Sequence, residues 1–134
     1  MTRVVIDTNV FVSSFLGGNP RRVIDLWKEG RVVLCLSGSI VDEYVAVLNR
    51  LSMTDEEELQ ELLALFAQEY HLIFTAKTPT LNVVQEDPAD NKFFECAAAL
   101  KAEYIISGDE EVLNVKNYMG INVLSPKDFL RVMG

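Results

Sequence analysis

Short apolar runs alternate with amphipathic stretches along this chain, and the alternation predicts strands that take turns with helices. Runs rich in valine, isoleucine, leucine and aromatic residues predict strands at residues 3–6, 31–36, 72–74, 104–107 and 121–124. Apolar residues at helical spacing predict helices between these strands, whereas residues 75–84 fit neither pattern. Strands that alternate with helices pair in parallel, so we expect a three-layer α/β/α sandwich with a mainly parallel sheet, formed by one domain of residues 1–134.

Capping residues predict where several helices begin. Asn19 followed by Pro20 is typical of an N-cap and a first helical position, and Asp87 followed by Pro88 has the same form. Residues 54–57, with the sequence Thr-Asp-Glu-Glu, predict a capping box at the start of an amphipathic helix.

The composition fits an ordinary globular domain, because 49% of the residues are hydrophobic and 24% are charged. No apolar run approaches the roughly 20 residues that span a bilayer. Asp7 and Asn9 interrupt the N-terminal apolar segment, which argues against a signal peptide. We therefore expect a cytoplasmic protein without a membrane segment.

The cysteine and histidine content argues against a zinc site or a catalytic thiol. Cys35 and Cys96 are the two cysteines, and His71 is the single histidine. A zinc site needs more soft ligands at short spacing, and a catalytic cysteine needs a basic partner. We expect both cysteines to pack as small apolar groups.

Four acidic residues are expected to meet at one edge of the sheet. Asp7 directly follows the first strand, and Asp109 follows the strand at 104–107 after one glycine. Ligands of open parallel sheets bind beyond the carboxyl ends of the strands. Glu43 and Asp90 lie in the first turns of two helices that should start at the same edge, so they are expected to join the other two acids.

Such a cluster calls for cations, because two carboxylates ~4 Å apart repel by about 4 kcal/mol at an effective dielectric of ~20. The four motifs contain no lysine, arginine or histidine that would pair with these acids. Oxygen ligands favour Mg²⁺ or Mn²⁺, and such a site can hydrolyse phosphodiesters. The alternative is that Glu43, Asp90 and Asp109 are helix-start acids stabilised by the helix dipole.

The net charge of −8 argues against strong non-specific binding of nucleic acid. Bound metal ions reverse the local field, so the charge does not exclude a metal-dependent nuclease. Arg21 and Arg22, together with Lys28 and Arg31, can supply a modest basic rim for RNA; the alternative is a solvated helix face.

The four acidic motifs, in this order and spacing, resemble those of the PIN domain family, and more closely those of its VapC-type toxin-like ribonucleases. The motifs are Val-Val-Ile-Asp-Thr-Asn-Val at 4–10, Ser-Ile-Val-Asp-Glu at 39–43, Asp-Pro-Ala-Asp-Asn at 87–91 and Ile-Ser-Gly-Asp at 106–109. The resemblance implies a metal-dependent endoribonuclease that cleaves RNA, with Mg²⁺ or Mn²⁺ held by Asp7, Glu43, Asp90 and Asp109. It also implies the toxin role of a toxin–antitoxin pair, an antitoxin partner and a homodimer.

Neighbouring residues are expected to support the cluster. Thr8 and Ser107 can orient a carboxylate or water through their hydroxyls, and Asn9 can hold the loop after the first strand. Glu111, with Glu110 beside it, stands where the family often has a second aspartate, and it is a candidate further ligand. Asp87 is a candidate as well, although its position favours an N-cap role.

Two alternatives to a nuclease are open at this point. A PIN-like protein can bind RNA or a partner without cutting it. A phosphotransfer or nucleotide-binding protein is disfavoured, because the chain has neither G-x-G-x-x-G nor G-x-x-x-x-G-K-[ST].

Overall fold

The computed structural model describes residues 1–53 and 57–134, so residues 54–56 of the predicted capping box lie outside the described residues. Within the described part of the chain, six strands form one sheet in the order β3-β2-β1-β4-β6-β5. The strands are β1 (Thr2–Ile6), β2 (Val32–Ser37), β3 (Leu72–Thr75), β4 (Tyr104–Ile106), β5 (Asn117–Tyr118) and β6 (Ile121–Leu124). All neighbours pair in parallel except β5 with β6, which confirms the predicted mainly parallel sheet.

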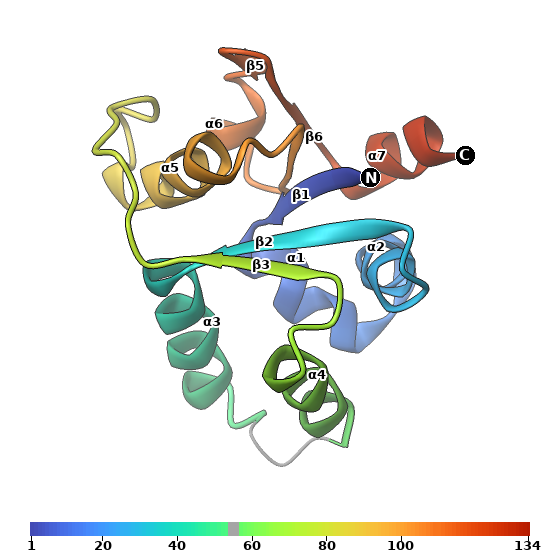
Figure 1. Cartoon of the computed structure of the whole chain (residues 1–134). Helices are drawn as coiled ribbons and strands as arrows, with labels where there is room; N and C mark the ends of the chain where they lie inside the picture. The colour runs from blue at the N-terminus through green and yellow to red at the C-terminus, as the bar shows by residue number, and fades with distance from the viewer. Residues whose placement is uncertain (54–56) are drawn as a thin grey trace.

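Helices cover both faces of this sheet. Figure 1 shows α5 (Asn91–Leu100) on one side and α1 (Thr8–Ser13), α2 (Gly18–Lys28), α3 (Gly38–Arg50) and α4 (Glu57–Ala67) on the other. The remaining helical elements among the described residues are α6 (Glu110–Leu113), α7 (Pro126–Met133) and two 3₁₀ turns, η1 (Ser14–Leu16) and η2 (Pro88–Asp90). The arrangement confirms the predicted α/β/α sandwich.

One predicted helix start is confirmed and one is wrong. The Asp87 side chain accepts a hydrogen bond from the Ala89 N–H at 3.2 Å and caps η2, as expected. Asn19 is not the N-cap of α2, which already begins at Gly18. Gly17 and Gly18 have φ of 96° and 71°, and this conformation, open mainly to glycine, turns the chain into the helix before Asn19 is reached.

The segment between β3 and η2 has no regular structure, but α5 holds it in place. The Leu81 N–H donates to the Glu95 carboxylate at 2.9 Å. The N–H groups of Val83 and Val84 both donate to Asn91 Oδ1, at 2.9 and 2.8 Å. Because the same segment leads into η2, these bonds fix the place at which the Asp87–Asp90 turn begins.

The core lies between the sheet and the two helical layers, and its largest fully buried side chains are those of Trp27, Phe11, Phe93, Phe94 and Phe129. Cys35 and Cys96 are buried and unpaired, as expected, and burial raises their thiol pKa values to about 11 and about 12. None of the helices in the described ranges is long and apolar enough to cross a lipid bilayer.

Candidate metal centre

Two of the predicted acids stand where neighbouring central strands end. Asp7 directly follows β1, caps α1, and donates its backbone N–H to the Ile106 carbonyl of β4 at 2.9 Å. Asp109 follows β4 and caps α6 by accepting the Glu111 N–H at 2.9 Å. Because β1 and β4 are parallel neighbours, both carboxylates lie at the same edge of the sheet.

The Asp7 carboxylate is buried, with 4% of the residue exposed, and it is held from both sides. Its Oδ2 accepts the Ser107 hydroxyl at 2.5 Å, and its Oδ1 accepts the Asn9 N–H at 3.2 Å. Burial raises the pKa of Asp7, the two hydrogen bonds lower it, and the charges of Asp109 and Glu43 raise it further. The Ser107 contact is made by its side-chain hydroxyl, whereas Asn9 contributes only its backbone N–H, so the supporting roles expected of these two residues stay predictions.

Glu43, in α3, is fixed by contacts at both oxygens. Its Oε1 accepts the Thr8 hydroxyl at 2.5 Å, and its Oε2 forms an ion pair with the Lys92 ammonium of α5. We expected no basic partner from the motifs themselves, and Lys92 follows the third motif directly. Its long side chain reaches from α5 to α3, and both side chains are more than half buried, at 18% exposed for Lys92 and 30% for Glu43.

Asp90 carries the most perturbed carboxyl of the four predicted acids. Its Oδ2 is buried and has no hydrogen-bond partner among the described residues. Burial, and then the negative charges of Asp87, Asp109, Asp7 and Glu43 in that order, together raise the pKa of this carboxyl to about 7. The other three predicted acids are therefore close enough to Asp90 for their charges to raise its pKa.

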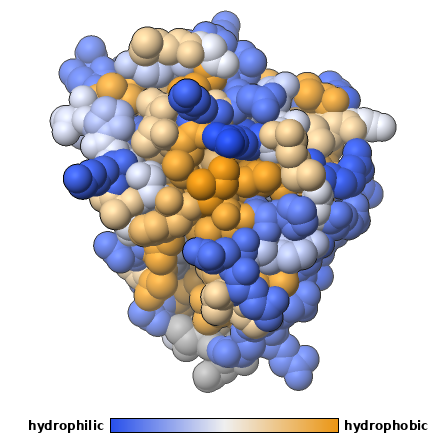
Figure 2. All heavy atoms as spheres, viewed as in Figure 1, coloured by the Kyte–Doolittle hydropathy of each residue, from blue (hydrophilic) through white to orange (hydrophobic). Residues whose placement is uncertain are grey.

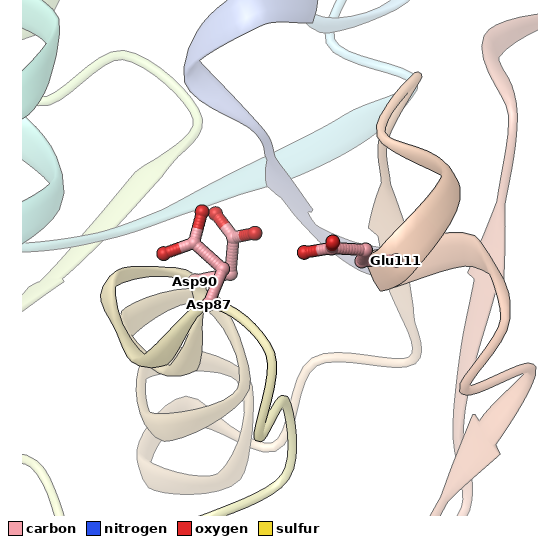
Figure 3. A group of neighbouring side chains, drawn as sticks. All are labelled: Asp87, Asp90 and Glu111. Carbon is pink, nitrogen blue, oxygen red and sulfur yellow. The ribbon is translucent and has the colours of Figure 1, made fainter.

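The tightest acidic group differs from the predicted one. Among the described residues, Asp87, Asp90 and Glu111 each offer a carboxylate oxygen, and these oxygens all lie within 4.8 Å of one another. Figure 3 shows Asp87 and Asp90, at the start of the α5 region, facing Glu111 of α6. Asp7, Glu43 and Asp109 lie around this group without closing to the same spacing. Asp87 thus combines its capping bond with a place in the cluster.

The donor set fits a hard divalent cation. It consists of carboxylate oxygens, one of which is buried without a partner, and like charges gathered so closely need a counter-ion or protons. Loss of hydration, followed by the charges of Asp109 and Asp87, raises the pKa of Glu111 as well. Oxygen-only sites of this kind suit Mg²⁺ or Mn²⁺ better than zinc or copper.

Arg21 and Arg22, expected to contact RNA, differ in how far contacts within the protein already engage their side chains. Arg21 donates to the carbonyls of Ser14 and Phe15 at 3.0 and 3.1 Å, and it forms an ion pair with Glu58 of α4 at 2.5 Å. These contacts bind η1 to α2 and α4. Arg22 is exposed, so of the two it has the side chain more available to a substrate.

Comparison with known proteins finds a family match and a related protein. Residues 3–111 match the PIN domain, and this range includes all six acids described above. The chain is also similar to the uncharacterized protein MJ1680 of Methanocaldococcus jannaschii, with 32% identity over 143 aligned positions that cover 96% of this chain and 89% of that protein.

Proposed function

The chain belongs to the PIN domain family, and from this premise we propose that it is a metal-dependent endoribonuclease that hydrolyses RNA phosphodiester bonds. PIN domains are generally nucleases that use divalent metal ions, and the acidic cluster fits that chemistry. In this proposal residues 1–134 act as one nuclease domain in the cytoplasm. The protein is the toxin of a toxin–antitoxin pair and works as a homodimer, and its antitoxin binds through a basic segment that complements the net charge of −8.

The observation that carries the proposal is the unpartnered, buried Oδ2 of Asp90 beside two further carboxylates. A carboxylate that only caps a helix would turn its oxygens to backbone N–H groups or to water. This oxygen instead faces like charge in a partly dehydrated place, where a proton or a cation would stabilise it. The helix-start alternative explains Asp109, which caps α6, but not Asp90.

Each acid has a role in the proposed site. Asp87, Asp90 and Glu111 would hold the cation together with Asp7, Glu43 and Asp109, the ligands expected from the sequence. When bound, Mg²⁺ or Mn²⁺ would supply positive charge for the phosphate and lower the pKa of a ligand water, which makes it a nucleophile at neutral pH. Ser107 keeps Asp7 oriented, while Thr8 and Lys92 keep Glu43 oriented. Lys92 also offsets part of the negative charge.

Cleavage of labelled single-stranded RNA tests the proposal directly. The purified protein is assayed with Mg²⁺, with Mn²⁺ and with a chelator, beside the variants Asp7→Asn and Asp90→Asn. Asp42→Asn is the matched control, because Asp42 is an exposed acid next to Glu43 on α3. We expect metal-dependent cleavage by the wild type and the control, and loss of cleavage in both site variants.

The opposite result would favour the binding alternative. If folded, metal-supplied protein cuts none of a varied set of RNAs, the chain is better described as a PIN-like binder without catalysis. For the toxin role, expression of the wild type should arrest growth of a host cell, and expression of Asp7→Asn should not. Equal growth of both strains would remove that part of the proposal.

A further inference from the structure

A lysine side chain places a positive charge among the acids of the candidate metal centre. Lys92 is the second residue of α5, and its ammonium forms an ion pair with Glu43 Oε2 of α3. α5 and α3 cover opposite faces of the sheet (Figure 1), so the pair spans the edge at which the acids lie. Of the ion pairs between described residues, this is the one that includes an acid of the centre.

The Lys92 head group is turned away from water. Figure 2 shows one side of the molecule, where hydrophilic residues surround an apolar middle. Lysines of such a rim keep their ammonium in solvent. The Lys92 side chain is instead only 18% exposed, and its Nζ lies 6.0 Å from the ring centre of the buried Phe93. An ammonium loses hydration in such a place, so nearby negative charge has to stabilise it.

Hydrogen bonds divide the carboxylate oxygens of the centre into two sets. Both oxygens of Asp7 accept hydrogen bonds, and both oxygens of Glu43 are engaged, one by a hydroxyl and one by Lys92. Asp90 Oδ2, by contrast, has no partner among the described residues, and Asp90 belongs to the tight group of three acids. The oxygen that most needs a cation therefore lies on the Asp90 side, whereas Glu43 already has one.

We propose that Lys92 takes the place of a second divalent cation, so that the centre binds one Mg²⁺ or Mn²⁺ tightly and not two. The inference rests on the metal centre of the proposed function and specifies how many ions it holds. In two-ion centres the ions lie ~3.5–4 Å apart. Lys92 already supplies positive charge at Glu43, and this charge would repel a second ion there.

An ammonium suits this position better than a second metal ion. Mg²⁺ needs near-ideal octahedral oxygen ligands and gives up its water reluctantly. The three N–H donors of a lysine rotate to meet whichever acceptors are present, and the flexible stem lets them reach across from α5. Because Lys92 is part of the chain, its charge is present at every metal concentration. An RNA phosphate would then meet one divalent ion and one fixed ammonium.

The number of Mn²⁺ ions bound per chain tests the inference. Free Mn²⁺ is followed by electron paramagnetic resonance during a titration at pH 7. We expect one tightly bound ion in the wild type and two in Lys92→Met, with the second at least ~10-fold tighter than any second ion of the wild type. Two ions held in one centre also couple magnetically, whereas an ion bound elsewhere does not couple to the first.

Three further variants complete the titration. Lys28→Met is the matched control, because Lys28 is 28% exposed and pairs with Glu61 at 3.1 Å, outside the centre. It removes the same charge and should bind one ion. Lys92→Arg keeps the charge and should also bind one. Lys92→Gln is a second neutral variant and should bind two, and circular dichroism checks that each variant is folded.

The outcomes separate this inference from the nuclease proposal. If Lys92 only ties α3 to α5, the neutral variants lose stability and still bind one ion, which overturns the inference. A wild type that binds two ions with similar affinity also overturns it; if that protein cleaves RNA with Mn²⁺, the nuclease proposal stands. A wild type that binds no Mn²⁺ removes the metal centre and this inference together.

Discussion

Replacement of Asp90 by asparagine should stabilise the metal-free protein, although it removes a proposed ligand. The fold holds this carboxylate among other negative charges, and its Oδ2 has no hydrogen-bond partner among the described residues. Asparagine has nearly the same shape but no charge, and its amide can donate to a neighbouring carboxylate. The substitution therefore removes repulsion without leaving a cavity.

The size of the effect follows from the pKa. The ordinary pKa of an aspartate is 3.8, and that of Asp90 is raised to about 7. Without screening by solvent, this difference in pKa would correspond to about 4 kcal/mol of unfolding free energy. The side chain is partly exposed, so water screens much of the repulsion, and we expect about 1–2 kcal/mol. For a domain of this length that is an increase of roughly 3–8 °C in Tm.

The raised pKa of Asp90 also predicts how the unfolding free energy of the wild type changes with pH. Below pH 3.8 the carboxyl carries a proton in both the folded and the unfolded state. As the pH rises toward 7, the folded protein keeps a proton that the unfolded chain has released, so the unfolding free energy falls. Above about pH 7 the loss is complete. The wild type should therefore be less stable than Asp90→Asn at pH 8, and the gap should narrow toward pH 4.

Urea unfolding with a chelator, at pH 4, 6 and 8, measures the difference in unfolding free energy between the wild type and Asp90→Asn. Asp42→Asn controls for the loss of one surface charge, and we expect it to change the unfolding free energy by no more than about 0.5 kcal/mol. Adding Mg²⁺ should raise the stability of the wild type more than that of Asp90→Asn. If Asp90→Asn instead destabilises the metal-free protein at pH 8, then the carboxylate is stabilised by the fold, and the reasoning that assigns it to a cation is refuted.

Three further substitutions probe the supporting contacts, each by urea unfolding. Lys92→Met should cost about 1–2 kcal/mol in the metal-free protein, because Glu43 loses its ion-pair partner; an equal loss with and without Mg²⁺ would argue against a cation nearby. Asn91→Ala should cost about 2–4 kcal/mol, because a buried and a partly buried backbone N–H lose their acceptor, and it should expose residues 76–87 to protease; unchanged digestion would contradict this. Tyr44→Phe should cost about 1 kcal/mol, since the Ile6 carbonyl loses a buried hydroxyl donor, and a neutral result would show that this bond adds nothing.

Sequence pattern was sufficient for the sheet because five of its strands are apolar runs bounded by polar or glycine residues. The strand at 121–124 agrees in both boundaries, and the others agree within two residues. α6 and β5 were not predicted, because elements of four and two residues are too short to show a period. The start of α2 was misplaced because a glycine pair, not the Asn-Pro signal, determines where the chain turns.

The sequence predicts the edge of the sheet at which the acids lie, but it does not predict which of their carboxylates lie closest together. Asp7 and Asp109 follow strands, so topology alone brings them to one edge. The Asp87, Asp90 and Glu111 group depends on η2, which is a 3₁₀ turn rather than the first turn of an α-helix. Asp87 is the N-cap of this turn, and its capping bond to the Ala89 N–H holds its carboxylate over the turn that carries Asp90. Lys92 was missed because a long side chain reaches beyond the motif that bears it.

The acids at this edge of the sheet should differ in how fast their backbone amides exchange with solvent, because Asp7 lies beside the central strands and Glu111 lies in a short helix. Asp7 directly follows the central strand β1, and its amide donates to the Ile106 carbonyl of β4, so exchange at that amide should require opening of the whole domain. The amide of Glu111 belongs to α6, a four-residue helix that can open alone. An ion at this site would therefore enter and leave when α6 opens locally, while Asp7 stays hydrogen-bonded to β4 as long as the domain is folded.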